Sequence, residues 1–393
     1  MKSSALQILR VSILAIGTML TMIAMTAMSA EVDTKADAIK RAADEAILPV
    51  MKAHAIPGMT VGIVANGKQY VFNYGLASKS EGTPVTDTTL FEIGSISKTF
   101  VATMATLAQG RGKLALTDTV ADHIPSLKGS SFGETTLLSL GTHTTGGLPQ
   151  QVPDEVSNNE QLISYLKNWK PDHPQGQYRT YSNVSIGLLG VIAAQSLQQP
   201  TATIMQGQIF PAFSMKNSFI VVPDSKRADY AQGYRQDDTP VRMKDGVLSA
   251  EAYGVKTTAS DLVQFIKANI GEMKLTPEFA LALENTHTGY FKAGGMTQSL
   301  VWELYPYPTD VAAVIEGSTD HMARDATPVK KITPPMISGE NVFIHKTGAT
   351  NGFGAYIAFV PEKKMGIVIL ANKNYPSAVR IKTAQQILGQ LGL

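Results

Sequence analysis

Both ends of the chain combine β-rich stretches with helices, as the spacing of apolar residues indicates. Apolar residues recur at helical spacing across 33–54, which predicts a first helix. Residues 59–65 and 69–76 are β-rich and are separated by Asn66-Gly67, a dipeptide typical of a two-residue hairpin. Residues 97–108 place their large apolar side chains on one helical face, so they predict a second helix.

The middle of the chain has a different texture, because helical stretches alternate there with long loops rich in Gly, Pro and Asn. After residue 341 short β-rich stretches return, and a closing helix follows them. The expected helices of these regions are 161–169, 186–194, 259–270 and 377–391, and the expected strands are 342–345, 354–360 and 365–371.

These patterns predict an α/β (α+β) fold with one antiparallel sheet, which is built from both chain ends and flanked by helices, and an inserted, mainly helical region. We expect the sheet domain to comprise residues 31–105 and 295–393, and the helical domain with its long loops to comprise residues 106–294. Pockets are common where two such regions meet, so we expect the functional site at their seam.

Residues 1–30 have the features of a secretory signal peptide. Lys2 and Arg10 precede an apolar run, and the small residues Ala27, Ser29 and Ala30 follow it near the expected cleavage point. The alternative is an uncleaved anchor, because the apolar run approaches the roughly 20 residues that span a bilayer. Gly and Thr residues within the run favour export, and hence no stable membrane association after cleavage.

Composition excludes several classes of function. Apolar residues make up 44% of the chain and charged residues 17%, which is enough apolar material for a large core. The net charge is +2, and the two excess cations lie within the first 30 residues, so the remainder offers no basic field for nucleic acid. Cysteine is absent from the sequence, which excludes disulfides, thiolate metal sites and cysteine nucleophiles.

Ser95 and Lys98 form a Ser-x-x-Lys pattern at the start of the helix expected over 97–108. If Ser95 opens this helix, its hydroxyl lies at the positive end of the helix dipole. Three residues make about one turn, so the Lys98 amine can reach the Ser95 oxygen and activate it as a nucleophile. The alternative is that Ser95 caps the helix and Lys98 is solvated.

Tyr181-Ser182-Asn183 forms a second polar segment, ahead of the apolar helix expected over 186–194. Nearby cations would favour the phenolate of Tyr181, which could then act as an acid or base. Asn183 offers an amide for hydrogen bonds to a substrate carbonyl. The alternative is an ordinary helix start that Ser182 or Asn183 caps.

Lys346-Thr347-Gly348 forms a third segment, at the end of an expected strand. A cation and a hydroxyl on a rigid strand suit an anionic group of a substrate. Gly348 allows a ligand to approach the backbone closely, and a following N–H could donate into an oxyanion hole. The alternative is a strand that ends in a glycine turn.

Together, and in this order, the three segments resemble the motifs of penicillin-binding proteins and serine β-lactamases. Tyr at the first position of the middle motif is similar to class C (AmpC-type) serine β-lactamases, whereas class A enzymes carry Ser-Asp-Asn there. Four longer stretches also resemble this family, so the similarity extends over essentially the whole mature chain. They are 91–100, 146–149, 250–257 and 345–376.

The resemblance implies the fold of that family and a cephalosporinase that confers β-lactam resistance by hydrolysing the β-lactam amide through an acyl-enzyme. It implies cephalosporins and penicillins as substrates, no cofactor and no metal, and a monomer in the periplasm of a Gram-negative bacterium. Ser95 is the implied nucleophile, and Lys98 and Tyr181 are the implied proton-handling pair. Which of the two is the base stays open, although Lys98 and Lys346 would push Tyr181 towards phenolate.

The resemblance also implies the groups that hold the substrate. Backbone N–H groups of Ser95 and Ala349 would form the oxyanion hole. Lys346, Thr347 and Arg380 would face the substrate's carboxylate. The remaining implied contacts come from Gln151, Asn183, Tyr253, Gly348 and Asn374.

The sequence departs from the family pattern at two positions. Ser377 stands where the family usually carries Asn, so we expect weaker carboxylate binding there. Gln150 replaces the usual apolar residue before Gln151, without a consequence that the sequence reveals.

Two alternatives use the same sequence features differently, and a third needs features that the sequence lacks. A penicillin-binding DD-peptidase or a related esterase would use the same Ser95 and Lys98, and a penicillin sensor would keep its Ser95 adduct. A zinc β-lactamase is disfavoured, because the seven histidines form no His-x-His-x-Asp cluster.

Overall fold

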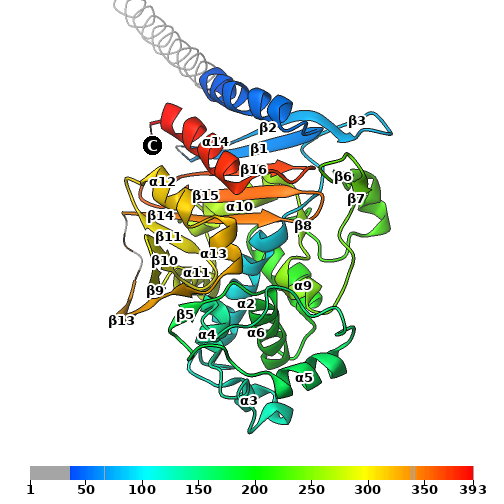
Figure 1. Cartoon of the computed structure of the whole chain (residues 1–393). Coiled ribbons are helices and arrows are strands. Elements are labelled where there is room, and N and C mark those ends of the chain that lie inside the picture. Colours follow the sequence, from blue (N-terminus) through cyan, green and yellow to red (C-terminus); the bar gives the residue numbers. More distant parts are fainter. Residues whose placement is uncertain (1–35, 66, 338, 340, 393) are drawn as a thin grey trace, which may run out of the picture.

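A ten-stranded antiparallel sheet forms the frame of the molecule, in the order β13-β9-β10-β11-β14-β15-β16-β1-β2-β3 (Figure 1). The structure is a computed structural model, and it describes residues 36–65, 67–337, 339 and 341–392. The predicted signal peptide, residues 1–30, lies outside these described residues. The strands of the sheet are β1 (Gly58–Ala65), β2 (Lys68–Ser78), β3 (Thr83–Pro84), β9 (Gly289–Ala293), β10 (Met296–Gln298), β11 (Glu303–Pro306), β13 (Lys330–Met336), β14 (Val342–Ala349), β15 (Gly354–Val360) and β16 (Met365–Ala371).

Helices and shorter strands surround this sheet. Residues 36–53 form the N-terminal helix. The other helices are α2 (Ser97–Gly110), α3 (Val120–His123), α4 (Leu137–Thr142), α5 (Asn159–Asn168), α6 (Asn183–Ser196), α7 (Thr201–Ile204), α8 (Phe210–Ala212), α9 (Ser249–Ala252), α10 (Ala259–Asn269), α11 (Pro277–Thr286), α12 (Val311–Glu316), α13 (Asp320–Arg324) and α14 (Ser377–Gln390). The short strands are β4 (Phe91–Glu92), β5 (Tyr178–Arg179), β6 (Gly233–Tyr234), β7 (Pro240–Val241), β8 (Lys256–Thr257) and β12 (Thr327–Pro328).

The two ends of the chain meet in the middle of the sheet, as the sequence predicts. β1 pairs with β2 on one side and with β16 on the other, so Val61 lies opposite both Phe72 and Ile369. The expected hairpin after β1 is confirmed, because Ala65 pairs with Lys68 across a two-residue connection. The middle of the sheet is therefore formed by pairing between segments about 300 residues apart, which fixes the two ends of the chain against each other.

The central strands are buried on both faces, and their side chains alternate between two cores. In β15, Ala355, Ile357 and Phe359 belong to the core shared with α2, α6 and α10. Tyr356 and Ala358 belong to the opposite core, beneath the N-terminal helix and α14 (Figure 1). This period of two, with helices on both faces, explains why these strands appear as nearly continuous apolar runs in the sequence.

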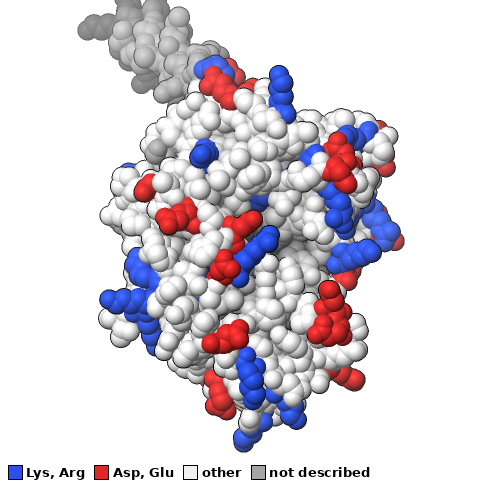
Figure 2. All heavy atoms as spheres, viewed as in Figure 1, with Lys and Arg blue, Asp and Glu red and all other residues white. Residues whose placement is uncertain are grey.

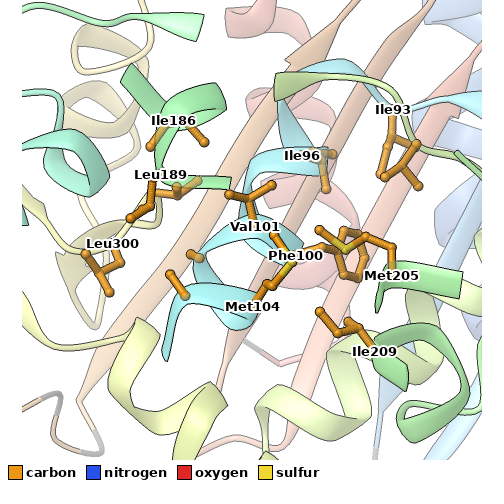
Figure 3. Close-up of a cluster of buried hydrophobic side chains, with 14 of the residues drawn as sticks. Ile93, Ile96, Phe100, Val101, Met104, Ile186, Leu189, Met205, Ile209 and Leu300 are labelled. Carbon is orange, nitrogen blue, oxygen red and sulfur yellow. The ribbon is translucent and has the colours of Figure 1, made fainter. Parts of the chain in front are cut away.

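The α2 helix lies at the centre of the larger core (Figure 3). Its Phe100 side chain is buried against Phe210 and Phe265, with ring centroids 5.3 and 4.3 Å away. Val101 and Met104 lie in the same cluster as Ile186 of α6. Because α2 is buried over most of its length, the residues at its start are held rigidly, and these include the Ser95–Lys98 motif.

The sequence analysis missed part of the sheet. β9, β10, β11 and β13 are short or polar on one face, and none was expected as a strand. β9 lies before residue 295, yet it pairs with β10 and β13 in the main sheet. The division at residue 295 stays a prediction.

Within the described ranges, no helix is long and apolar enough to cross a membrane.

A buried amide links the adjacent strands β16, β1 and β2 to the loop that carries Gln232. Asn372, directly after β16, accepts a hydrogen bond from the Gly58 backbone N–H at 2.8 Å. Its amide nitrogen donates to the carbonyl oxygens of Leu76, Ala77 and Gln232 at 3.0 to 3.2 Å. Removing this side chain would leave several buried backbone groups without partners, which is costly.

We expect Asn372→Ala to lower the free energy of unfolding by about 3 kcal/mol, because more than one buried backbone group loses its partner. Urea unfolding followed by circular dichroism measures this loss. Asn168→Ala is the matched control, because that amide is exposed and donates to one helix carbonyl. The control should change the stability by less than about 0.5 kcal/mol. Equal small effects in both variants would contradict a structural role for Asn372.

Candidate active site

A cleft of about 910 Å³ opens where the sheet meets the helical region. Apart from Lys98, which lies behind Ser95, every residue singled out as a candidate lines it. On the face drawn in Figure 2, positive and negative side chains are interspersed. The lining candidates are Ser95, Gln151, Tyr181, Asn183, Tyr253, Lys346, Thr347, Gly348, Ala349, Asn374 and Arg380.

Ser95 lies in η1 (Gly94–Ile96), a single 3₁₀ turn that continues directly into α2. Lys98 follows one turn later, is fully buried, and donates to Ser95 Oγ at 2.9 Å. The second partner of the ammonium group is the Ala252 carbonyl oxygen, at 2.8 Å. Lys98 is therefore not solvated, and no side-chain hydrogen bond caps this helix among the described residues. The capping alternative does not hold.

Two glycines allow the η1 turn and the end of β14 to come into backbone contact. Gly94 has φ +51°, and a Cβ on it would lie 2.5 Å from the Ala349 nitrogen. A Cβ on Gly348 would lie 2.0 Å from the Ile93 carbonyl oxygen. A larger residue at either position would push the two segments apart, so glycine is required at both. The Ser95 turn and Ala349 are adjacent for this reason.

Tyr181 lies between β5 and α6, and Ser182 caps α6 by accepting from the Ser185 N–H. The phenol ring lies among cations, with Lys98 Nζ and Lys346 Nζ each 5.3 Å from its centroid and Arg179 Cζ 5.4 Å from it. Its hydroxyl is buried and has no hydrogen-bond partner among the described residues.

The cations around Tyr181 change how it titrates. Burial raises the pKa of Tyr181, but the ammonium groups of Lys346 and Lys98 outweigh this effect and leave the pKa below its ordinary value. Burial also lowers the pKa of Lys98, with Tyr181 opposing the shift and Lys346 adding to it. Because the pKa of each group depends on the charge of the other, the phenol of Tyr181 and the amine of Lys98 titrate as a coupled pair.

A buried acid that the sequence analysis missed holds two of these cations. Glu303, on β11, accepts from Arg179 at 3.2 Å and from Lys346 at 3.4 Å. Arg179 also donates to Gln298 and to the Met322 carbonyl. Burial would raise the pKa of Glu303, but Lys346 and Arg179 contribute to an opposing effect that holds it below its ordinary value. Glu303 therefore stays ionised and neutralises part of the buried positive charge.

Two buried histidines lie next to this cluster. His345 Nε2 is 3.5 Å from Glu303, but burial lowers the pKa of His345 to about 4, so the ring is neutral at pH 7. His143 packs against Tyr181 with its ring tilted by 39° and the centroids 4.4 Å apart, and its Nδ1 accepts from the Ser182 N–H. Burial, Arg179 and Lys98 hold the pKa of His143 well below its ordinary value. Among the described residues, no cluster of His, Cys, Asp and Glu could hold a metal ion.

β14 is longer than the predicted strand, and its end presents the third motif to the cleft. Thr347 and Ala349 are partly or fully exposed there, whereas Lys346 is buried. Arg380, on α14, lies behind this strand and is 2% exposed. It donates to the carbonyl of Gly348 at 2.7 Å and also to Asn374 Oδ1 and the Tyr375 carbonyl. Its guanidinium is thus engaged by protein oxygens at the cleft wall.

The remaining candidates line the opposite side of the cleft. Asn183 begins α6, and its amide nitrogen donates to Gln151 Oε1 at 2.8 Å. The Asn183 Oδ1 atom is buried and has no hydrogen-bond partner among the described residues, and the residue lines the cleft. Tyr253 is half-buried directly after α9 and also lines the cleft.

The two departures from the family pattern also lie at the cleft. Gln150 donates across it to the carbonyl of Ala323, on α13, at 3.3 Å. Ser377 begins α14 and lines the cleft near Asn374. An apolar residue at position 150 could not make the first contact, so Gln150 joins the helical region to α13 in this chain.

Comparison with known proteins identifies the family. The family model Beta-lactamase matches residues 43–391. A β-lactamase from Pseudomonas fluorescens is 47% identical over 353 residues, which cover 90% of this chain and 99% of that relative. A solved class C β-lactamase in complex with cefoxitin is 47% identical, has a TM-score of 0.88, and covers 90% of this chain and 99% of its own.

A further solved neighbour is named D-alanine carboxypeptidase AmpC, from Burkholderia cenocepacia. It is 48% identical, has a TM-score of 0.87, and covers 90% of this chain and 99% of its own. These neighbours confirm the expected fold and the resemblance on which it was based. The chain belongs to the β-lactamase family, and within that family to class C.

Proposed function

We propose that this class C β-lactamase hydrolyses cephalosporins and penicillins with Ser95 as its nucleophile. The observation that supports this assignment most is the 2.9 Å hydrogen bond from Lys98 to the Ser95 hydroxyl, beside a phenol that lies among cations. A hydroxyl of ordinary acidity needs a base within reach, and both candidate bases lie beside this one.

Acylation begins when Ser95 Oγ attacks the β-lactam carbonyl. The Ser95 proton passes to the Tyr181–Lys98 pair, and the pair returns a proton to the ring nitrogen as the amide bond breaks. We assign the base to Tyr181, because Lys98 and Lys346 stabilise its phenolate. The carbonyl oxygen gains negative charge in this step, and the backbone N–H groups of Ser95 and Ala349 stabilise it. Such a donor is typically worth about 3 kcal/mol.

Deacylation uses the same Tyr181–Lys98 pair, with water as the nucleophile in place of Ser95. Water gives its proton to the same pair and attacks the Ser95 ester, and the pair then returns the proton to Ser95 Oγ. The products are the ring-opened acid and the free enzyme. Because no cofactor takes part, the electrostatic environment of the pair determines the rate of both half-reactions.

The cleft walls bind the two ends of the substrate. Asn183 and Gln151 contact the amide side chain, and their place side by side in the cleft lining supports this assignment. Lys346 and Thr347 bind the carboxylate. We assign Arg380 a supporting role, because its guanidinium holds Gly348 and Asn374 at the cleft wall and is almost fully buried. Tyr253 lines the pocket beside the acyl group.

Two further assignments rest on the sequence alone. We propose export to the periplasm with removal of residues 1–30, because this leader has the charge and apolar pattern of a signal peptide. We also propose that the mature chain acts as a monomer without stable membrane association.

A D-alanine carboxypeptidase activity is the second candidate function, and the name of the Burkholderia cenocepacia neighbour supports it.

Ser95→Ala should abolish the acyl adduct in intact-protein mass spectrometry, because the attacking oxygen is removed. The wild-type protein should hydrolyse a cephalosporin well beyond one equivalent. Ser97→Ala is the control, because the Ser97 hydroxyl accepts from the Val255 N–H instead, and this variant should still form the adduct. An adduct on Ser95→Ala would contradict the nucleophile. One stoichiometric burst by the wild type would instead favour the peptidase or a penicillin sensor.

Lys346→Met should raise KM for an anionic cephalosporin by about ten- to a hundredfold, because one charge-assisted hydrogen bond is lost. KM for a neutral ester should change much less. The acidic limb of kcat/KM should also move to higher pH. Lys346 lowers the pKa of both Tyr181 and Lys98, so removing it raises both values. Lys330→Met, on the exposed face of β13, is the control. Equal KM changes for both substrates would contradict carboxylate binding by Lys346.

Ser377→Asn should lower KM for anionic cephalosporins by a few-fold, because the longer amide can donate a hydrogen bond to the carboxylate. The value of kcat should stay within about twofold, since Ser377 lies away from the Ser95–Lys98 pair. Steady-state kinetics with an anionic cephalosporin and a neutral ester measure the difference. A lower KM for both compounds would show a general change of the cleft rather than a carboxylate contact.

A further inference from the structure

A buried carboxylate outside the catalytic cluster connects three segments near the Ser95 turn. Glu92, on β4, is 1% exposed and lies three residues before Ser95. Its Oε1 atom accepts from the Tyr230 hydroxyl at 2.5 Å and from the Met243 N–H at 2.8 Å. Its Oε2 atom accepts from the Thr350 hydroxyl at 2.5 Å. Both oxygens are thus engaged, and each partner belongs to a different part of the chain.

These contacts lie directly beside the proposed oxyanion hole. Thr350 follows Ala349, whose N–H is one proposed donor, and Glu92 lies two residues before Gly94, which packs against Ala349. The Glu92–Thr350 hydrogen bond therefore spans the same junction as the backbone contact between Gly94 and Ala349. The backbone contact between Gly94 and Ala349 sets the distance between the Ser95 turn and the end of β14. The hydrogen bond between the Thr350 and Glu92 side chains also prevents one segment from sliding along the other.

The third contact extends this link to the cleft wall. Met243 lines the cleft, and its N–H is held by Glu92. Arg242, beside it, lies over the Tyr230 ring at 4.3 Å and donates to the Ala231 carbonyl. Tyr230 is itself held by Glu92, so one carboxylate fixes the loop that carries Met243 as well as the end of β14. Neither Glu92 nor Tyr230 lines the cleft.

We propose that Glu92 is a positioning residue for catalysis, which acts through the Thr350 hydroxyl to align the Ala349 N–H with the acyl carbonyl oxygen. It touches no substrate. This inference rests on the proposed oxyanion hole. A donor that is displaced, and not removed, should stabilise the developing oxyanion less, so the loss should be smaller than the roughly hundred- to thousandfold effect of removing a donor.

Thr350→Val is the variant that tests this link, because it removes the hydroxyl and keeps the side-chain shape. We expect kcat for a cephalosporin to fall about tenfold, with KM changed less. The carbonyl stretching band of the acyl-enzyme should move to higher wavenumber in infrared difference spectra, as the hydrogen bonds to the carbonyl weaken. Thr350→Ser keeps the donor and should stay close to wild type in both measurements.

Variants of Glu92 separate its action from any direct effect of Thr350, which lines the cleft. Glu92→Gln can keep all three contacts, because the amide oxygen can accept from Tyr230 and Met243 while the amide nitrogen donates to Thr350. This variant should therefore retain most of the activity and the wild-type band. Glu92→Leu should reproduce the changes of Thr350→Val. If it does not fold, Tyr230→Phe removes one contact and should shift the band in the same direction.

The outcomes distinguish this inference from the function on which it rests. A wild-type carbonyl band at the frequency of an ester without hydrogen bonds would contradict the oxyanion hole itself. A low wild-type band that stays unchanged in Thr350→Val, with unchanged kcat, would overturn the role of Glu92 and leave the oxyanion hole in place. A lower melting temperature without a band shift would show that the link is merely structural.

Discussion

The proposed catalytic arrangement depends on burying several cations around one phenol without separating them from compensating charge. Tyr181 lies beside Lys98, Lys346 and Arg179, and cations gathered around one buried ring repel one another once water is excluded. Glu303 reduces this repulsion by accepting from two of the three. Lys98 instead donates to a main-chain carbonyl and to a hydroxyl, neither of which carries charge. Lys98 is thus the least compensated of the three cations, and its burial lowers its pKa.

Lys346 and Lys98 differ in whether a carboxylate compensates them, and this difference suits them to separate functions. Lys346 is paired with Glu303 at 3.4 Å, so a carboxylate compensates this buried cation directly. Lys98 has no carboxylate partner among the described residues, so it can lose or share its proton with Tyr181 and Ser95 at modest cost. A second carboxylate beside Lys98 would stabilise its ammonium form and remove this advantage. At about 5 Å from the Tyr181 ring, the Lys98 ammonium group can both stabilise the phenolate and share a proton with it.

The sequence predicted the parts of the site that depend on local spacing. Ser95 and Lys98 lie one turn apart, so any helix brings them together, and β14 follows from its apolar pattern. Glu303 could not be predicted in this way, because its partner Arg179 lies 124 positions away and nothing near β11 marks it. Arg380 lies at the cleft as the sequence predicted, but its spacing could not show that its guanidinium is buried and donates to four protein oxygens.

The same distinction holds for the fold. Strands buried on both faces, such as β15 and β16, appear as apolar runs, and their bounds agree with prediction to the residue. β9, β10 and β13 depend on neighbours along the sheet, so pairing decides their conformation more than their own sequence does. The catalytic groups come from both kinds of segment. The rigid central strands and α2 hold the Ser95 turn and β14, whereas β11, which pairs with β14, supplies the acid that makes their buried charge tolerable.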